Sequence, residues 1–442
     1  LSTTQVSNLN TMLISALNGT QVAALTPQHV SILTTTQLAA LYATQINAIG
    51  VSQVKSLSMT QLAQLSTTQV ALLNTTQIKT MNTTQIRALS ETQIAALSTE
   101  QIPGFASTHI ATLTTTQLSG LNASAVGSLT TSQIRGLTSS QMASLTTTQL
   151  SGLNSSGVAS LNTKQVVSLT TTQIVSLSTA QVAALTSQSL RALTTTQVAS
   201  LESTDIAALS TLQVKMLLSQ QISMLDTGQI KGLSAEDVEM LSTAQLKGLT
   251  TTQLVSMSTM QTSALTSTQI KSLSITHILG LTTTQLAALG DGQIAGLTSQ
   301  QLAVLNTAQL SSLPSTLIAA LSTAQVKGLS TAHIGSMSTM QISGMSSTQI
   351  KSMSTTQIRA LTTAQVASLT PTQESGLTSV QVGILTTDQV NSLTTTQVAD
   401  LSTVQVKALT STQIRQLTVA QIAALEAVDV GALSTKQIGA FL

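Results

Sequence analysis

The chain has 442 residues, of which 42% are hydrophobic, 7% are charged and 1% are aromatic, and it contains neither Cys nor Trp. The lack of Cys excludes a disulfide framework, a thiolate metal site and a Cys nucleophile. A formal net charge of +2 provides no basic patch for nucleic acid, and no apolar run reaches the length of about 18 residues that spans a membrane. We therefore expect neither nucleic-acid binding nor membrane insertion, although the hydrophobic content suffices for a core.

An eight-residue repeat runs through the whole chain. Apolar residues recur every eight positions from Leu1 to Phe441, which defines 55 complete octapeptides with the consensus LTTTQIAA and no insertion or deletion. We number the positions of each octapeptide one to eight and call them slots. Slot one is always apolar, slot six is apolar in 53 of 55 octapeptides, and slot five is Gln in 43 of 55. Because no linker interrupts this register, we expect one array over residues 1–442.

Each octapeptide carries its own helix start signal. Slot two is Ser, Thr, Asn or Asp in 47 of 55 octapeptides and supplies an N-cap, while the Gln of slot five completes a capping box. The apolar residues of slots one and six then occupy the two positions of a hydrophobic staple. The pattern is complete over residues 33–41, and its core and cap residues are Leu33, Thr34, Gln37, Leu38 and Leu41. In chain order, short helices are predicted at 3–8, 11–16 and every eight residues thereafter, to 435–440.

The charged residues support the same interpretation. Fourteen of the 16 Lys and Arg residues occupy slot seven, and 11 of the 14 acidic residues occupy slots two to five. Acids near the start and bases near the end of a helix complement its dipole. The basic residues also mark slot seven as part of the solvent-facing side. Slot eight is mostly Ala, Ser or Gly, and we attribute this to a neighbouring backbone that passes close by.

The array is predicted to be an all-α solenoid. One continuous helix is excluded because eight residues at 100° each would rotate the apolar stripe by about 80° per octapeptide. A helix of about six residues is unstable alone, so its stability must come from stacking, with slots one and six filling the interior. We expect three or four octapeptides per superhelical turn. The alternative is a β-solenoid with two octapeptides per coil, which the many Thr, Val and Ile residues would favour.

Candidate chemical groups are few. The four His residues all replace Gln in slot five, and we interpret them as polar substitutes for the Gln cap: His29, His109, His277 and His333. Three acidic pairs fall on cap and box positions, so we assign them to helix starts rather than to Ca²⁺: Glu202 with Asp205, Glu236 with Asp237, and Glu426 with Asp429. Glu374 is an anomaly because it occupies the core slot six without an evident partner. We expect no catalytic residue, no bound cofactor and no metal.

Two resemblances bear on this interpretation. The segment LTPQHVSIL at residues 25–33 resembles the opening of TAL effector repeats, which implies a capped helix there. It ends after about nine residues, before any base-reading loop, so DNA reading does not transfer. The whole chain resembles the long LTTxQIxAL arrays of large secreted or surface proteins of Gram-negative bacteria, as in LTTTQVASL at 193–201. That resemblance implies an extracellular fibre, stalk or adhesin and supplies no site residue.

The leading functional hypothesis is a structural role. Few charges and many hydroxyl groups suit an extracellular filament, stalk or surface fibre that also adheres, at the cell surface or outside the cell. Both ends are consensus octapeptides rather than polar capping repeats, so we expect a segment of a longer array or end-to-end self-association, with lateral self-association as a further hypothesis. The alternative is a binding module that recognises a regular surface, such as ice or polysaccharide, through rows of Thr.

Overall fold

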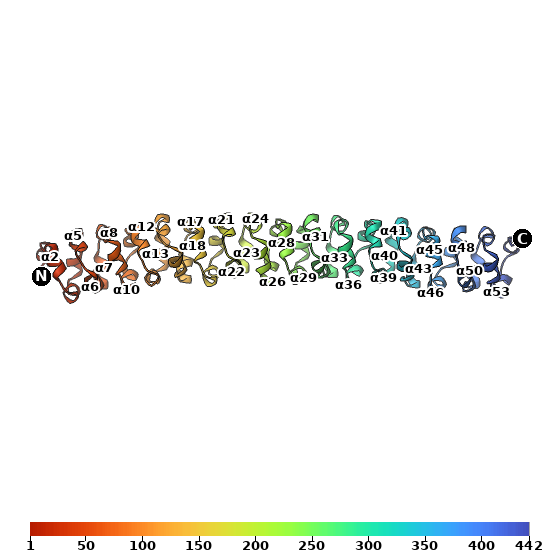
Figure 1. Ribbon diagram of the computed structural model, residues 1–442, viewed down its shortest axis with the longest axis horizontal. Coiled ribbons are helices and arrows are strands. Elements are labelled where there is room, and N and C mark those ends of the chain that lie inside the picture. Colours follow the sequence, from red (N-terminus) through yellow and green to blue (C-terminus); the bar gives the residue numbers. More distant parts are fainter. Residues whose placement is uncertain (442) are drawn as a thin grey trace. The chain divides into compact units, whose positions relative to one another are not determined.

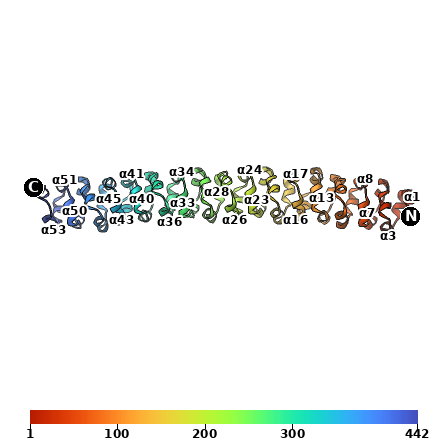
Figure 2. The ribbon, with the colours of Figure 1, turned by 180° about the vertical axis from the view of Figure 1, so that it is seen from behind.

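Short helices make up the whole of the described chain. The computed structural model describes residues 1–441, in which there are 54 α-helices of four to six residues, one 3₁₀ helix and no strand. The all-α prediction is therefore confirmed and the β-solenoid alternative is wrong. Contacts divide the chain into two units, Leu1–Met224 and Leu225–Leu442, which we describe separately. Figures 1 and 2 show that, within each unit, the short coiled segments follow one another in sequence order.

The helices of the first unit begin at slot three and end at slot seven or eight, apart from the 3₁₀ helix η1. They are α1 (Thr3–Ser7), α2 (Thr11–Ala16), α3 (Gly19–Ala23), α4 (Pro27–Ser31), α5 (Thr35–Ala39), α6 (Ala43–Ala48), α7 (Val51–Ser56), α8 (Met59–Ala63), α9 (Thr67–Ala71), α10 (Thr75–Thr80), α11 (Thr83–Arg87), α12 (Glu91–Ala95), η1 (Ile102–Gly104), α13 (Ser107–Thr112), α14 (Thr115–Ser119), α15 (Ala123–Gly127), α16 (Thr131–Gly136), α17 (Ser139–Ser144), α18 (Thr147–Ser151), α19 (Ser155–Ala159), α20 (Thr163–Val167), α21 (Thr171–Val175), α22 (Thr179–Ala184), α23 (Ser187–Ala192), α24 (Thr195–Ala199), α25 (Ser203–Ala208), α26 (Thr211–Met216) and α27 (Ser219–Ser223).

The helices of the second unit follow the same rule, except that two of them end at slot six. They are α28 (Thr227–Gly232), α29 (Ala235–Met240), α30 (Thr243–Gly248), α31 (Thr251–Ser256), α32 (Thr259–Ser263), α33 (Ser267–Ser272), α34 (Ile275–Gly280), α35 (Thr283–Ala287), α36 (Asp291–Gly296), α37 (Ser299–Ala303), α38 (Thr307–Ser311), α39 (Ser315–Ala319), α40 (Thr323–Gly328), α41 (Thr331–Ser336), α42 (Thr339–Ser343), α43 (Ser347–Ser352), α44 (Thr355–Arg359), α45 (Thr363–Ala367), α46 (Pro371–Ser375), α47 (Ser379–Gly383), α48 (Thr387–Asn391), α49 (Thr395–Ala399), α50 (Thr403–Ala408), α51 (Ser411–Ile414), α52 (Val419–Ala423), α53 (Ala427–Gly431) and α54 (Thr435–Ile438).

The corners between helices are made by extended residues rather than by left-handed ones. Leu57 in slot one has φ −62° and ψ 130°, and Ser58 in slot two has φ −74° and ψ 160°. The described residues include no positive φ angle, at Gly or elsewhere. Two consecutive extended residues redirect the chain, and the N-cap of slot two then starts the next helix. The corners therefore require no fixed glycine, in agreement with its absence from slots one and two of the consensus.

The length of one superhelical turn follows from the contacts between turns. Helices three octapeptides apart pack against each other, as α4 does against α7 and α47 against α50. The side chain of Gln149 donates to the oxygens of Leu118 and Leu121, 31 and 28 residues earlier. Other contacts between turns join residues 25 to 29 positions apart, such as Arg135 with Ser160 and Ser56 with Pro27. These separations centre on 28 residues, the separation of Gln149 from Leu121, so one turn takes about three and a half octapeptides. This value lies between the two predicted values, three and four.

Slot eight lies against the backbone of the preceding turn. A Cβ atom added to Gly120 would lie 2.6 Å from the main-chain oxygen of Glu91, which belongs to that turn. The same approach joins Gly136 to Ser107 and Gly296 to Ser267. The preference for Ala, Ser and Gly in slot eight thus has the cause that we inferred, namely a neighbouring backbone.

The octapeptide at residues 97–104 departs from the rule of one α-helix per repeat. Its only helix is the 3₁₀ helix η1 (Ile102–Gly104). Pro103 occupies slot seven, where it has no N–H to donate to a helical carbonyl and disfavours helical geometry at the residue before it. Ile102 and Phe105 are nevertheless buried, so the core continues through the altered repeat.

Candidate functional site

The residues predicted from the repeat pattern lie together in the first unit. Leu33, Leu38 and Leu41 are buried. The Thr34 hydroxyl oxygen accepts a hydrogen bond from the Gln37 N–H at 3.2 Å, and Gln37 Oε1 accepts one from the Thr34 N–H at 2.8 Å. The two bonds satisfy donors that the first turn of α5 would otherwise leave unpaired. All five residues therefore serve the stability of the repeat.

The amide nitrogen of Gln37 has a second role, which the sequence analysis missed. Its Nε2 donates to the main-chain oxygens of Leu9 at 2.7 Å and Val6 at 3.3 Å, on the preceding turn. The same arrangement recurs at slot five in both units, up to Gln437, and we call it the glutamine ladder. The residue types found in slot five already indicated this second role. A capping box accepts Glu as well as Gln, yet no slot five holds Glu. Gln provides both the acceptor for its own helix and the donor for the previous turn, whereas a carboxylate provides only the acceptor.

The histidines of slot five imitate Gln. His333 Nδ1 accepts from the Ser330 N–H at 3.2 Å, and its Nε2 lies 2.7 Å from the main-chain oxygen of Leu305 on the preceding turn. His277 repeats this geometry, with Nε2 2.9 Å from Leu249 O. His109 and His29 accept from the N-cap N–H in the same way. Burial lowers the pKa of His109, against a smaller opposing effect of its hydrogen bond to the Met81 backbone. At His109 the cap requires a neutral ring, because Nδ1 accepts the hydrogen bond from the Ala106 N–H.

The three acidic pairs lie at helix starts. Asp205 is buried, and its Oδ2 accepts from the Glu202 N–H at 3.0 Å. An aspartate at slot five keeps the cap but cannot donate to the carbonyls of the previous turn. At Asp237 this substitution leaves a buried polar atom unsatisfied, because Oδ1 has no hydrogen-bond partner. Among the described residues, no group of three or more His, Asp or Glu side chains is placed to hold a metal ion.

Glu374 is the one charged residue of the core slot six. Its side chain is 1% exposed, and neither carboxyl oxygen has a hydrogen-bond partner. Burial, aided by the negative charge of Asp400, raises the pKa of Glu374 to about 8. Thr262, the other polar residue of slot six, differs because its hydroxyl donates to Ser258 O at 2.9 Å. Glu374 is therefore a destabilising group that is neutral at low pH.

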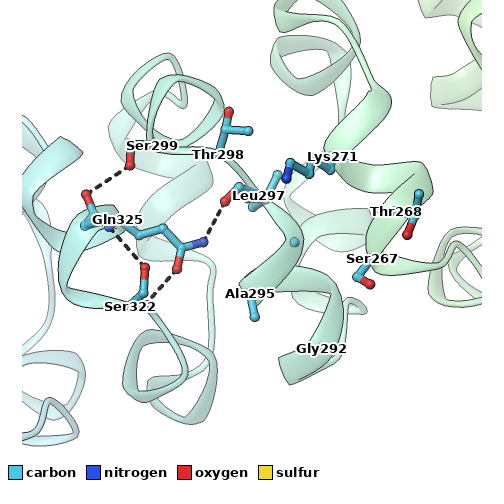
Figure 3. Close-up of a pocket in the computed structure, with 12 residues that line it drawn as sticks. Ser267, Thr268, Lys271, Gly292, Ala295, Leu297, Thr298, Ser299, Ser322 and Gln325 are labelled. Carbon is cyan, nitrogen blue, oxygen red and sulfur yellow. Dashed lines mark hydrogen bonds between the residues drawn. The ribbon is translucent and has the colours of Figure 1, made fainter.

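A surface depression with a volume of about 540 Å³ lies in the second unit (Figure 3). Three consecutive turns line it, through residues 267–271, 292–299 and 322–325. Gln325 Nε2 donates to Leu297 O at 2.7 Å, and the Ser299 hydroxyl donates to Ala324 O at 2.9 Å. Lys271 is its one charged lining residue. Hydroxyl groups and one ammonium in an open depression can form hydrogen bonds, but they provide no paired acid and base.

Comparison with known proteins identifies the repeat. The sequence profile of the ALTTAQ repeat matches residues 78–107, 142–179, 158–195, 198–235, 238–275, 318–355 and 342–379, which together cover half of the chain. No curated protein matches the chain. A solved structure titled "Structure of APUM23-GGAAUUGACGG" aligns over 99% of this chain and 94% of its own, at 12% identity and a TM-score of 0.16. That score is too low to support an inference about fold or ligand.

In the described part of the chain, none of the helices combines the length and the apolar character needed to cross a bilayer.

Proposed function

Because this chain belongs to the ALTTAQ repeat family, we propose that it is a structural repeat protein that forms an extracellular filament, stalk or surface fibre, with a capacity to adhere. The observation that carries the proposal is the glutamine ladder. Gln is the polar side chain most often found in the interior, and it is committed to bonds between successive turns, as with Gln133 and the oxygens of Ile102 and Phe105. A residue used in this way contributes to cohesion and leaves none of its polar atoms for a ligand.

The exterior of each unit supports the same proposal. All 16 Lys and Arg side chains are exposed, and the remaining outer positions are mostly Ser and Thr. The surface is rich in hydroxyl groups and low in charge density, and a chain without Cys has no thiol to oxidise. These are properties that an external fibre needs, and the proposal places the protein at the surface of the cell or outside it. No catalytic step is part of it.

The test is labelling of the cells that produce the protein. Antibodies against the array should label intact cells and should decorate fibres in immunogold electron micrographs. A strain lacking the gene is the control and should lose both. Labelling that requires permeabilised cells would overturn the extracellular role, and surface labelling without extended particles would overturn the fibre.

A second candidate function is recognition of a regular surface, such as ice or polysaccharide. The observation that favours it is the exposure of consecutive Thr residues at helix starts, as at Thr115 and Thr116. Such pairs recur around each unit at slots three and four. Thermal hysteresis of the purified chain, or its retention on an insoluble glycan, would favour this function. Absence of both would leave the structural role as the one supported.

A further inference from the structure

Three of the seven basic residues of the first unit recur at twice the length of a superhelical turn. Lys79, Arg135 and Arg191 follow one another at intervals of seven octapeptides. Because one turn takes three and a half octapeptides, they lie on one side of the unit, two turns from one another. Lys164 falls midway between Arg135 and Arg191 in the sequence, so it occupies the same side on the intervening turn.

A surface depression shows that residues from three successive turns lie on one side of the first unit. A cavity of about 480 Å³ is lined by Ser139, Lys164 and Ala192, which belong to three consecutive turns. Ser139 lies close in sequence to Arg135, and Ala192 adjoins Arg191. All four basic side chains are exposed, and we call them the basic stripe of the first unit: Lys79, Arg135, Lys164 and Arg191.

The second unit has a basic stripe with the same spacing. Three pairs of its bases are seven octapeptides apart: Lys271 with Lys327, Lys351 with Lys407, and Arg359 with Arg415. Lys247 precedes Arg359 by twice that interval, so Lys247, Arg359 and Arg415 share one side, and these three residues form the basic stripe of the second unit. Lys271 and Lys327 lie one-seventh of a turn from this stripe, and Lys351 and Lys407 lie two-sevenths of a turn from it, on the same side as Glu239. Lys271 appears on the wall of the depression in Figure 3, and Lys407 and Arg359 line two further depressions. Asp388 interrupts this stripe between Arg359 and Arg415.

Most exposed acidic residues lie on the opposite side. In the first unit, Glu91 follows Lys79 and Glu202 follows Arg191, each by slightly less than half a turn. In the second unit, three acids lie close to half a turn from a basic residue of the stripe: Glu236 before Lys247, Asp400 before Arg415, and Glu426 after Arg415. We call these five acids the acidic side. Arg87 and Lys231 are the two bases that lie among the acids rather than on a stripe.

We propose that a second copy of this chain packs alongside the first, with the basic stripe of one copy facing the acidic side of the other. A self-complementary pair of faces is what lateral association of identical chains requires. A polyanion would use only the basic stripe, and the balance of 16 basic and 14 acidic residues does not favour such a ligand. The inference rests on the structural function proposed above and names the partner for it.

The test uses charge reversal in the full chain. One variant carries Arg135→Glu and Arg191→Glu, and a second carries Glu91→Lys and Glu202→Lys. The wild-type chain should self-associate in sedimentation velocity at about 20 mM NaCl and about tenfold more weakly at about 300 mM NaCl, because salt screens exposed charges. Each variant alone should self-associate about tenfold more weakly than wild type at low salt. An equimolar mixture of the two should restore association, since each then meets opposite charge.

The matched control is Arg87→Glu with Lys231→Glu, which makes the same change in net charge away from the stripes. Because it adds negative charge to the acidic side, it should associate at least as strongly as wild type, and circular dichroism should show that all variants keep their helices. The proposal is overturned if the control weakens association as much as the stripe variant, or if the mixture does not associate. Retention of wild type but not of the stripe variant on heparin, with no self-association at low salt, would replace the second copy by a polyanion. Surface labelling of cells is a separate readout, so failure here is distinguishable from failure of the extracellular role.

Discussion

The side-chain amide nitrogen of Gln141 donates to the main-chain oxygen of Leu113, 28 residues earlier, at 2.8 Å, while its amide oxygen accepts from the Thr138 N–H at 2.7 Å. One side chain thus starts its own helix and joins it to the preceding turn. The local bond and the long-range bond depend on different atoms of the same amide. A substitution that replaces only the amide nitrogen therefore separates the contribution of the cap to stability from that of the bond between turns.

Gln141→Glu should keep the cap and remove the bond between turns. The carboxylate accepts from Thr138 N–H but faces the oxygens of Leu113 and Ile110 without a proton to donate. We expect the unfolding free energy to fall by about 2–4 kcal/mol, measured by urea denaturation. Gln21→Glu is the control, because Gln21 is exposed and accepts from the Asn18 N–H at 2.8 Å. Equal destabilisation by both would contradict the importance of the ladder.

Asp205→Gln should restore the ladder at a position where it is broken. A Gln at this position would accept from the Glu202 N–H and also reach Leu177 O on the preceding turn. The expected gain in unfolding free energy is about 1 kcal/mol, measured as a rise in Tm. Glu202→Gln, at the adjacent exposed N-cap, should leave Tm nearly unchanged. If Asp205→Gln lowers Tm, the buried carboxylate must make a contact that Gln cannot replace.

Glu374→Ile should stabilise the protein, and the gain should grow with pH. The pKa of Glu374 is about 8 in the folded chain, against 4.5 for an ordinary glutamate. Between these values the folded chain holds a proton that the unfolded chain has released, so native stability falls as pH rises and the loss is complete above pH 8. In thermal melts we expect Tm to rise at pH 5 and to rise more at pH 9, by an amount equivalent to about 1–4 kcal/mol.

Thr262→Ile is the control for Glu374→Ile. Its hydroxyl is already bonded to Ser258 O, so its effect should be small and independent of pH. A gain at Glu374 that is equal at pH 5 and pH 9 would contradict the raised pKa. A fall in Tm would show that Glu374 makes a specific favourable contact.

His109 should make stability depend on pH in the opposite sense. Burial lowers the pKa of His109 below its ordinary value of 6.5. As pH falls below 6.5, the unfolded chain takes up a proton that the folded chain refuses, so the unfolding free energy decreases until pH passes the folded pKa. In His109→Gln this part of the decrease should disappear from urea denaturation curves recorded across this pH range, because Gln satisfies the same positions without titrating. Parallel pH profiles for variant and native chains would contradict the assignment.

Local structure was predictable from the sequence because its determinants lie within one octapeptide. Thr34 and Gln37 are three residues apart, and that spacing alone predicts the cap, the helix start and the buried positions of Leu33 and Leu38. The length of the turn was predictable only as three or four octapeptides. It depends on which distant carbonyl Gln37 reaches, and the sequence of one octapeptide does not determine that distance. The absence of Glu from slot five was a readable sign that the amide nitrogen is used.

Two further features, the alignment of the basic residues and the environment of Glu374, could not be predicted without the length of the superhelical turn. The recurrence of Lys79, Arg135 and Arg191 at every seventh octapeptide is visible in the sequence, yet it has no meaning until the length of the turn is known. The orphaned carboxyl group of Glu374 was anticipated from its slot, whereas its raised pKa required the burial and the nearby Asp400. The α-helix predicted in the octapeptide at residues 97–104 was wrong. The reason is local, because Pro103 in slot seven disfavours an α-helix by sterics alone.

A turn of three and a half octapeptides constrains how such a gene can lengthen. Duplication of any whole number of octapeptides preserves the glutamine ladder, because slot five always meets slot one of the preceding turn. Duplication of a single octapeptide, however, rotates everything downstream by two-sevenths of a turn and would divert a line of charges to another side. Only a duplication of seven octapeptides, or of a multiple of seven, leaves every later side chain facing its former direction. An array that lengthens in multiples of seven octapeptides therefore keeps its patterned sides in line.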